Sequence, residues 1–202
     1  MRWLGLFLML CVAGEGLAAE IFLVAEYSPK PIYPSALHRA GVTGDVKVSL
    51  TVHADGSVSK VRVLQSDHPG LADAAKEATE QWRFKPWTVD AEKLAVVELI
   101  APIQFRLDDP IDAHAWLKEV KCREINRSFV RFAEFNWVDL TAFRYTRAYL
   151  TNGVFHHPWS NEERLALIAK LNRQAPYIAR ECLNSPNSRF KRFLPEEIRK
   201  LL

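Results

Sequence analysis

The sequence predicts a small α+β domain followed by an all-α helical domain. Apolar and polar residues alternate over residues 45–53 and again over about 95–107, whereas residues 111–202 carry apolar residues at spacings of three and four. Alternation with a period of two is typical of half-buried strands, and the longer spacing is typical of amphipathic helices. A change of charge at the join supports the division into two domains.

The net charge of +3 is distributed unevenly along the chain. Residues 20–109 hold ten Lys and Arg against thirteen Asp and Glu, whereas residues 110–202 hold sixteen against ten. Asp108-Asp109-Pro110 marks the change, and proline disfavours helical geometry in the residue before it. We therefore expect one domain over residues 20–109 and a second over residues 110–202.

Residues 1–19 have the composition of a signal peptide. Arg2 supplies a positive start, an apolar stretch of twelve residues runs from Trp3 to Gly14, and small residues follow for cleavage. A membrane-spanning helix needs an apolar run of about 18 residues or more, and Glu15 interrupts this run too early. We expect export with no stable membrane span after cleavage, and an uncleaved anchor is the alternative.

The first alternating run predicts a strand with one apolar face. That face consists of Val46, Val48, Leu50 and Val52. Asp55-Gly56 then predicts a tight hairpin turn in which both residues accept positive φ. The return strand carries Val61 and Val63 on one face, and Val58, which is one residue out of phase, is expected in the turn or in a bulge.

A helix is expected after the hairpin. Pro69 suits the first helical position, because its fixed φ fits a helix and its missing N–H is not needed there. Asp67 or His68 is the expected cap. Apolar residues then form one helical stripe, and they are Leu71, Ala74, Ala75, Ala78 and Trp82. Because most of them are alanine, this helix can lie close against a sheet.

The last strand of this domain is expected from about Ala95 to Leu107. Its inner face comprises Val97, Leu99, Ala101, Ile103 and Phe105. Its outer face holds the candidate partner-binding residues, which are Val96, Glu98, Ile100, Gln104 and Arg106. Pro102 cannot donate a ladder hydrogen bond, so the strand is expected at the edge of the sheet. An open edge can accept an extended peptide, and the alternatives are an edge protected by Glu98 and Arg106 or one used in homodimerisation.

Several short motifs follow one another in this part of the chain. They are Tyr33-Pro34-Ser35-Ala36, Gly41, Gly44-Asp45-Val46, Asp55-Gly56 with Val58, Ala74-Ala75, Trp82-Arg83-Phe84 with Pro86, and Pro102-Ile103 with Phe105 and Leu107. In this order and spacing they resemble the C-terminal domain of TonB-type energy transducers. The resemblance extends from about residue 30 to residue 107. A Tyr-Pro pair alone would be a weak signal, but the ordered set is specific.

The resemblance implies a three-stranded antiparallel sheet backed by helices. It also implies the periplasm of a Gram-negative bacterium, where the family adds a segment near the N-terminus of outer-membrane transporters to its sheet. In the family, energy comes from an inner-membrane motor, reached through a transmembrane helix and a long proline-rich linker. Here about ten residues separate the signal region from Lys30-Pro31, and an extended chain reaches at most about 3.5 Å per residue. We therefore expect binding without force generation.

The helical domain carries two apolar stripes, each of which includes one cysteine. The first consists of Cys122, Ile125, Phe129 and Phe132. The second consists of Leu165, Ile168, Leu171, Ala175, Ile178 and Cys182, after a capping box formed by Ser160 and Glu163. Pro176 within the second stripe is expected to kink the helix or to start a new one.

Cys122 and Cys182 form an even set once the signal is removed, and exported proteins meet an oxidising compartment. We expect a disulfide between them, with two unrelated buried thiols as the alternative. The aromatic residues between Phe129 and Trp159 are expected in the core, and a binding groove is the alternative. The basic tail is expected as a solvated face or as a contact for an anionic partner or membrane surface. It comprises Arg189, Lys191, Arg192, Arg199 and Lys200.

The sequence contains no G-x-S-x-G, H-E-x-x-H or P-loop motif. His156-His157 is the only histidine pair, and adjacent residues do not share a helix face. We expect no enzyme, no metal or other cofactor and, after export, no nucleic-acid partner. The leading hypothesis is a periplasmic protein that binds an extended segment of an envelope protein, such as an outer-membrane transporter, by β-augmentation. The second is a structural or assembly protein that dimerises through the sheet edge, with the helical domain as its interaction surface.

Overall fold

The alternating valines build the central strand of the sheet. The computed structural model describes residues 23–90, 94–108, 110–129, 133–152 and 159–202, so the expected signal peptide lies outside the described residues. On β2 (Gly44–His53), the four apolar residues of the predicted inner face are at most 1% exposed. β2 pairs antiparallel with β3 (Val58–Ser66) and with β5 (Val96–Phe105), which gives the strand order β3-β2-β5. The predicted three-stranded sheet is confirmed.

The turn between β2 and β3 differs from the expected one at its first residue. Gly56 has a φ of 82°, but Lys60 is the only described non-glycine residue with positive φ, so Asp55 does not share that geometry. The Asp55 carboxylate instead accepts hydrogen bonds from the backbone N–H and the hydroxyl of Ser57, at 2.9 and 2.6 Å. A side-chain cap therefore replaces the second left-handed residue.

A β-bulge in β3 accounts for the change of phase between its valines. The register shifts between the pairs Ser49–Arg62 and Thr51–Ser59, where Lys60 adopts a φ of 51°. The extra residue reverses which side chains of β3 face the core. Val58 therefore packs on the same core as the two valines beyond the bulge. The expected bulge is confirmed, although Val58 itself lies in β3 and not in the turn.

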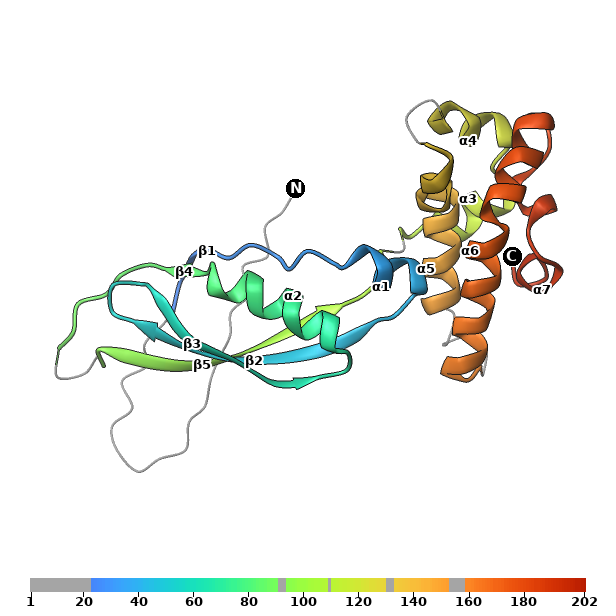
Figure 1. Cartoon of the computed structure of the whole chain (residues 1–202). Helices are drawn as coiled ribbons and strands as arrows, with labels where there is room; N and C mark the ends of the chain where they lie inside the picture. Colours follow the sequence, from blue (N-terminus) through green and yellow to red (C-terminus); the bar gives the residue numbers. More distant parts are fainter. Residues whose placement is uncertain (1–22, 91–93, 109, 130–132, 153–158) are drawn as a thin grey trace.

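Helix α2 (Pro69–Glu80) covers one face of the sheet (Figure 1). His68 caps it, because its Nδ1 accepts a hydrogen bond from the N–H of Gly70 at 3.0 Å. Leu71 and Ala75 are fully buried against β2 and β3. The helix and its apolar stripe are confirmed, except that Trp82 lies just beyond the helix end and is half-buried.

The chain before the sheet forms two further elements. α1 (Ser35–Ala40) ends at Gly41, whose φ is 72°. β1 (Ala25–Tyr27) pairs with β4 (Arg83–Phe84) in a second, two-stranded sheet. The sequence did not predict this sheet, because strands of three and two residues are too short to show a periodicity.

The second part of the described chain is helical throughout. Its elements are α3 (Ala113–Glu119), α4 (Cys122–Phe129), the 3-10 helix η1 (Glu134–Asp139), α5 (Thr141–Asn152), α6 (Asn161–Asn184), the 3-10 helix η3 (Phe190–Phe193) and α7 (Glu196–Arg199). Pro176 lies inside α6, so the expectation that it might start a new helix is wrong. Phe143 is fully buried and several other aromatic residues pack around the same core, which confirms the expected role of the aromatic cluster. Phe132 lies outside the described residues.

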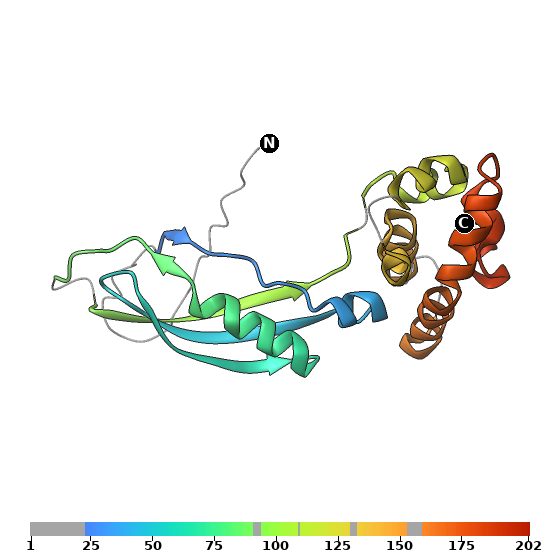
Figure 2. The same cartoon turned by 45° about the horizontal axis from the view of Figure 1, so that its top comes forward.

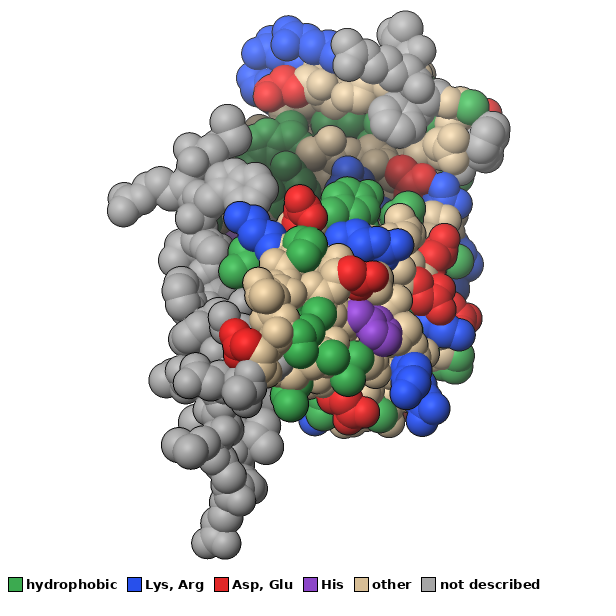
Figure 3. All heavy atoms as spheres, turned by 90° about the vertical axis from the view of Figure 1, so that its left-hand side faces the viewer, with side chains coloured by type: hydrophobic (Ala, Val, Ile, Leu, Met, Phe, Trp, Pro, Cys, Tyr) green, Lys and Arg blue, Asp and Glu red, His purple; other side chains and the backbone are tan. Residues whose placement is uncertain are grey.

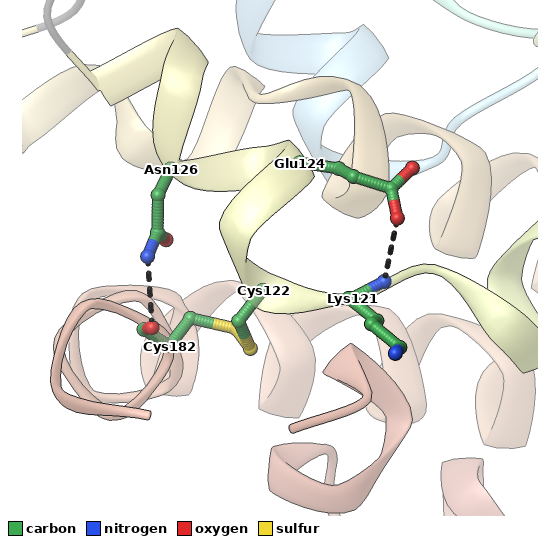
Figure 4. The surroundings of a disulfide bond; sticks show 5 residues. All are labelled: Lys121, Cys122, Glu124, Asn126 and Cys182. Atoms are coloured by element: carbon green, nitrogen blue, oxygen red, sulfur yellow. Dashed lines mark hydrogen bonds between the residues drawn. A yellow bond between two sulfur atoms is a disulfide. The ribbon is translucent and has the colours of Figure 1, made fainter. Parts of the chain in front are cut away.

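A disulfide joins the two cysteine-bearing helices, as expected. Cys122 at the start of α4 and Cys182 near the end of α6 have Cα atoms 4.9 Å apart (Figure 4). The side-chain amide of Asn126 also donates to the Cys182 carbonyl at 3.0 Å. Both cysteines are at most 1% exposed, so the bond lies within the core of this domain.

The sheet and the helical domain lie at opposite ends of the molecule and meet at α1 (Figures 1 and 2). Each end has its own hydrophobic cluster, one around β2 and α2 and the other around α5 and α6. The boundary near residue 109 remains a prediction. In the described part of the chain, no helix combines the length and apolar composition that a membrane crossing requires.

Candidate functional site

The outer face of β5 is accessible at every position proposed from the sequence. These exposed residues are Val96, Glu98, Ile100, Gln104 and Arg106. Among the described strands β5 pairs with β2 alone, and the strand order leaves its other side open. Val96 and Ile100 are 45% and 49% exposed, so apolar side chains accompany the open edge.

The hydrogen-bond register determines which backbone groups of β5 face the open side. The N–H of Ala54 donates to the carbonyl of Ala95 at 2.9 Å, in continuation of the β2–β5 register. Hydrogen-bonded and non-hydrogen-bonded pairs alternate in an antiparallel ladder. The odd-numbered residues of β5 therefore bond to β2, and the N–H and C=O groups of the even-numbered residues from Val96 to Gln104 point away from it.

Pro102 occupies one of these outward positions, opposite Lys47 of β2. At this position a backbone N–H would point to the open side, so the lack of one in proline removes no hydrogen bond to β2. This explains how a proline fits within a ten-residue strand. The open side keeps three successive donors, at Val96, Glu98 and Ile100, before this interruption. A fourth donor follows at Gln104.

The inward side chains hold β5 in place. Leu99, Ala101, Ile103 and Phe105 are between 4% and 9% exposed. The ring of Tyr33 packs edge-on against Phe105, with centroids 5.3 Å apart, and its hydroxyl donates to the Val42 carbonyl at 2.5 Å. Burial raises the pKa of Tyr33 despite the opposing effect of nearby arginines. The open edge thus belongs to a strand whose inner side chains are packed into the core.

Arg106 differs from the other candidate residues, because it follows the end of β5. Its Nη1 donates to the Gly44 carbonyl at 3.0 Å and its Nη2 pairs with the Asp45 carboxylate at 2.8 Å. The guanidinium therefore ties the end of β5 to the start of β2. The structure brings the other four residues together along one edge and gives Arg106 a contact of its own.

The end of the sheet domain that carries the β2–β3 turn exposes side chains of several chemical types. The part of this end that is coloured in Figure 3 shows hydrophobic, acidic and basic side chains side by side. Val89, Leu94 and Val96 are among the exposed hydrophobic residues near it. The coloured part of this end therefore mixes hydrophobic and charged side chains (Figure 3).

A second group of polar side chains joins α1 to the helical domain. The Arg39 guanidinium donates to both carboxylate oxygens of Asp139, at 2.9 and 2.5 Å. The Asn172 amide donates to the Arg39 carbonyl at 2.6 Å, and Arg164 donates to the Gly41 carbonyl at 2.8 Å. The hydrogen bond of Arg39 to Asp139 raises its pKa. These contacts link residues that are 100 to 133 positions apart.

Arg147 lies behind this junction and is fully buried. It donates to the Val138 carbonyl at 2.8 Å and to the Asn172 side chain at 3.2 Å. Its Nη2 lies 3.9 Å from the Asp139 carboxylate. Burial lowers its pKa to about 10, although Asp139 opposes the shift. Asp139 therefore lies between one arginine from each domain.

This junction has no signature in the sequence that would predict it. Arg39 and Asp139 are charged residues on short helices, and their pattern is that of ordinary solvated faces. Arg147 is the one residue whose position could have indicated a buried polar contact, because it lies on an apolar stripe of α5 between Phe143 and Leu150. A charged residue at a core position of a helix usually has a specific partner.

The described side chains offer little for metal or cofactor chemistry. Within the described ranges, no three His, Cys, Asp or Glu side chains are grouped closely enough to hold a metal ion. His156 and His157 lie outside these ranges. What the site can do chemically is form hydrogen bonds and apolar contacts along β5.

Comparison with known proteins identifies the sheet domain. Residues 29–107 match the family model described as Gram-negative bacterial TonB protein C-terminal. Protein TonB of Xanthomonas campestris is 33% identical over 93 residues, which are 46% of this chain and 41% of the relative. Protein TonB of Vibrio cholerae is 28% identical over 102 residues, 48% of this chain and 41% of the relative. The matched segment thus spans about two fifths of each of these relatives.

A solved structure also aligns with this part. The solution NMR structure of the Pseudomonas aeruginosa TonB CTD shares 26% identity, covers 44% of this chain and 89% of that chain, and gives a TM-score of 0.37. The family match, which begins before α1 and ends just beyond β5, confirms the resemblance found in the sequence motifs. Residues 29–107 are therefore similar in sequence to the TonB C-terminal family.

Proposed function

We propose that this protein is a periplasmic binding protein that adds an extended segment of an envelope protein to the open edge of β5. The N-terminal segment of an outer-membrane transporter is the proposed partner, in keeping with the TonB-like domain. Binding is non-enzymatic and needs no cofactor.

The observation that carries this proposal is the run of outward-facing backbone groups on β5. Val96, Glu98 and Ile100 each present one N–H and one C=O to the open side. An added strand can satisfy these groups by main-chain hydrogen bonds, which give affinity with little dependence on sequence. Alternating side chains then give selectivity, here two half-exposed apolar residues on either side of a carboxylate.

The direct test is a proline at the centre of this edge. Ile100→Pro removes an outward N–H but none of the hydrogen bonds to β2, so the domain should keep its fold. We expect a synthetic peptide with a transporter N-terminal segment to bind at least about tenfold more weakly, because a hydrogen bond is lost and the ring obstructs the added strand. Titration calorimetry measures the affinity, and circular dichroism checks the fold.

Ile100→Val is the matched control, because it keeps the N–H and the branched apolar side chain. It should bind the peptide about as well as the natural chain. Unchanged affinity in Ile100→Pro would show that the edge is not the binding site. Sedimentation at micromolar concentration tests the alternative, since a stable dimer without peptide affinity would indicate homodimerisation through the edge.

A further inference from the structure

The proposed function leaves one strongly charged surface of the helical domain unused. We call it the basic face, and it comprises Lys121, Arg189, Lys191, Arg192, Arg199 and Lys200. It is formed by the connection before α4, by η3 with the residue before it, and by α7 with the residue after it. All of these residues except Lys121 belong to the basic tail expected from the sequence, and the structure adds Lys121.

Backbone pairing brings the first part of the basic face together. Lys121 and Arg189 form an isolated antiparallel β-bridge. On either side of it, the N–H of Cys122 donates to the Ser188 carbonyl at 2.9 Å and the N–H of Phe190 donates to the Val120 carbonyl at 3.0 Å. Figure 4 shows Lys121 beside the disulfide that fixes this end of the domain. The two cations are therefore held side by side by a rigid support.

The short helices supply the remaining cations. In η3 the three-residue turn places Phe190 and Phe193 on the side of the core. Lys191 and Arg192 fall between them, and Arg192 is exposed. The guanidinium of Arg199 donates to the Arg192 carbonyl at 3.4 Å, which brings α7 against η3.

The positive charge of this surface is only partly neutralised. Arg189 pairs with Glu119 and Lys200 pairs with Glu196, each at 2.8 Å. Among the described residues, no carboxylate lies within ion-pairing distance of Lys121, Lys191, Arg192 or Arg199. Four cations thus remain available to an external anion.

We propose that the basic face binds an anionic lipid surface. Its cations come from separate segments and are spread over one end of the domain, which suits the diffuse charge of a headgroup layer. The pocket on α6, which is lined by residues such as Trp159, Leu167 and Arg173, shares no residue with this face. Basic clusters near a membrane gain affinity with each Lys or Arg that reaches the headgroups.

The position of the basic face determines whether a bound membrane would obstruct the sheet. η3 and α7 lie on the side of the helical domain that is turned away from the sheet (Figures 1 and 2). A membrane against the basic face would therefore leave β5 free to meet a partner. The lipid contact does not depend on the proposed function, because lipid binding and peptide binding are measured separately.

The test compares two triple variants of the full chain by vesicle co-sedimentation. Lys191→Gln, Arg192→Gln and Arg199→Gln together remove three unpaired cations of the basic face. Lys47→Gln, Arg62→Gln and Lys85→Gln remove the same charge from exposed positions of the sheet domain. Each cation near an anionic surface contributes about fivefold to the partition coefficient, so the first variant should lose on the order of 100-fold on vesicles that contain phosphatidylglycerol.

We expect the sheet-domain variant to bind those vesicles nearly as well as the natural chain, and neither protein to bind pure phosphatidylcholine. Equal binding by both variants would overturn the proposal, as would failure of the natural chain to bind. A preference for soluble polyglutamate over the vesicles at the same ionic strength would also overturn it, in favour of an acidic protein partner. Thermal melting confirms that both variants are folded.

Discussion

Gly41 is one of the residues at which the sheet domain contacts α6. Its φ of 72° favours glycine, and an added Cβ would lie 2.4 Å from Cδ1 of Ile168 on α6. Its carbonyl accepts a hydrogen bond from Arg164, which is 6% exposed. Backbone conformation and packing space thus both favour glycine here, which the sequence marked only as part of a family motif.

His38 should make this junction sensitive to acid. Its pKa is lowered, first because burial disfavours the charged ring and then because Arg147 and Arg144 repel it. Asp139 and Asp108 oppose the shift without reversing it. The unfolded chain takes up this proton near pH 6.5, so the folded state loses stability as the pH falls from there through the lowered pKa. Above that window, His38 contributes no pH dependence.

Thermal melting of the natural chain and of His38→Gln between pH 7.5 and pH 4.5 measures this effect. We expect the melting temperature of the natural chain to fall more steeply on acidification than that of the variant. Gln65→Asn, at an exposed position of β3 that does not titrate, is the control and should follow the natural chain. Parallel curves for all three proteins would contradict the assignment to His38.

The disulfide fixes how α4 packs against α6. It closes a loop of 60 residues, and the chain-entropy model assigns such a crosslink about 4 kcal/mol of stability. We expect reduction to lower the stability of the helical domain by that order and to leave the sheet domain unaffected. Hydrogen exchange followed residue by residue distinguishes the two domains, and the mass shift after alkylation confirms that the bond was reduced.

Cys122→Ala with Cys182→Ala is the matched control for this experiment. The double variant should resemble the reduced protein and should not respond further to reductant. Loss of protection in β2 and β5 on reduction would contradict the view that each domain has its own core. An unchanged helical domain would show that helix packing alone is sufficient.

At the scale of elements, the sequence predicted those strands and helices that are long enough to show a periodic pattern of apolar residues. The valines of β2, the alanine stripe of α2 and the proline of β5 each appear in the structure where their pattern placed them. β1 and β4 were missed, because they are too short for a pattern. Pro176 lies inside α6, which runs from Asn161 to Asn184, so the new helix that the sequence allowed does not begin there.

For the whole molecule, the junction between the domains could not be predicted from the sequence. Arg39, Asp139 and Asn172 have no spacing in common, since their contact depends on the folded shape of both domains. The candidate edge, in contrast, could be proposed from Pro102 and the alternation around it. The structure adds that the even-numbered backbone groups of β5 are the outward ones.

Arg39→Ala should loosen the two domains relative to each other. The pair with Asp139 is partly exposed, at 38% and 29%, so we expect a cost of only about 1 kcal/mol. The larger effect should be a greater radius of gyration in small-angle X-ray scattering. Lys76→Ala, which breaks an exposed ion pair with Glu80 inside the sheet domain, is the control and should leave scattering unchanged. An unaltered profile for Arg39→Ala would mean that Arg164 and Asn172 suffice to hold the junction.

The central claim is that a partner segment adds to the open edge of β5. Amide hydrogen exchange with and without a transporter N-terminal peptide tests it most directly. We predict that the amides of Val96, Glu98 and Ile100 exchange rapidly in the free protein and become protected in the complex. The amides of Val97 and Leu99, which already bond to β2, should be slow in both. Rapid exchange of the three outward amides in a saturated complex would contradict the account.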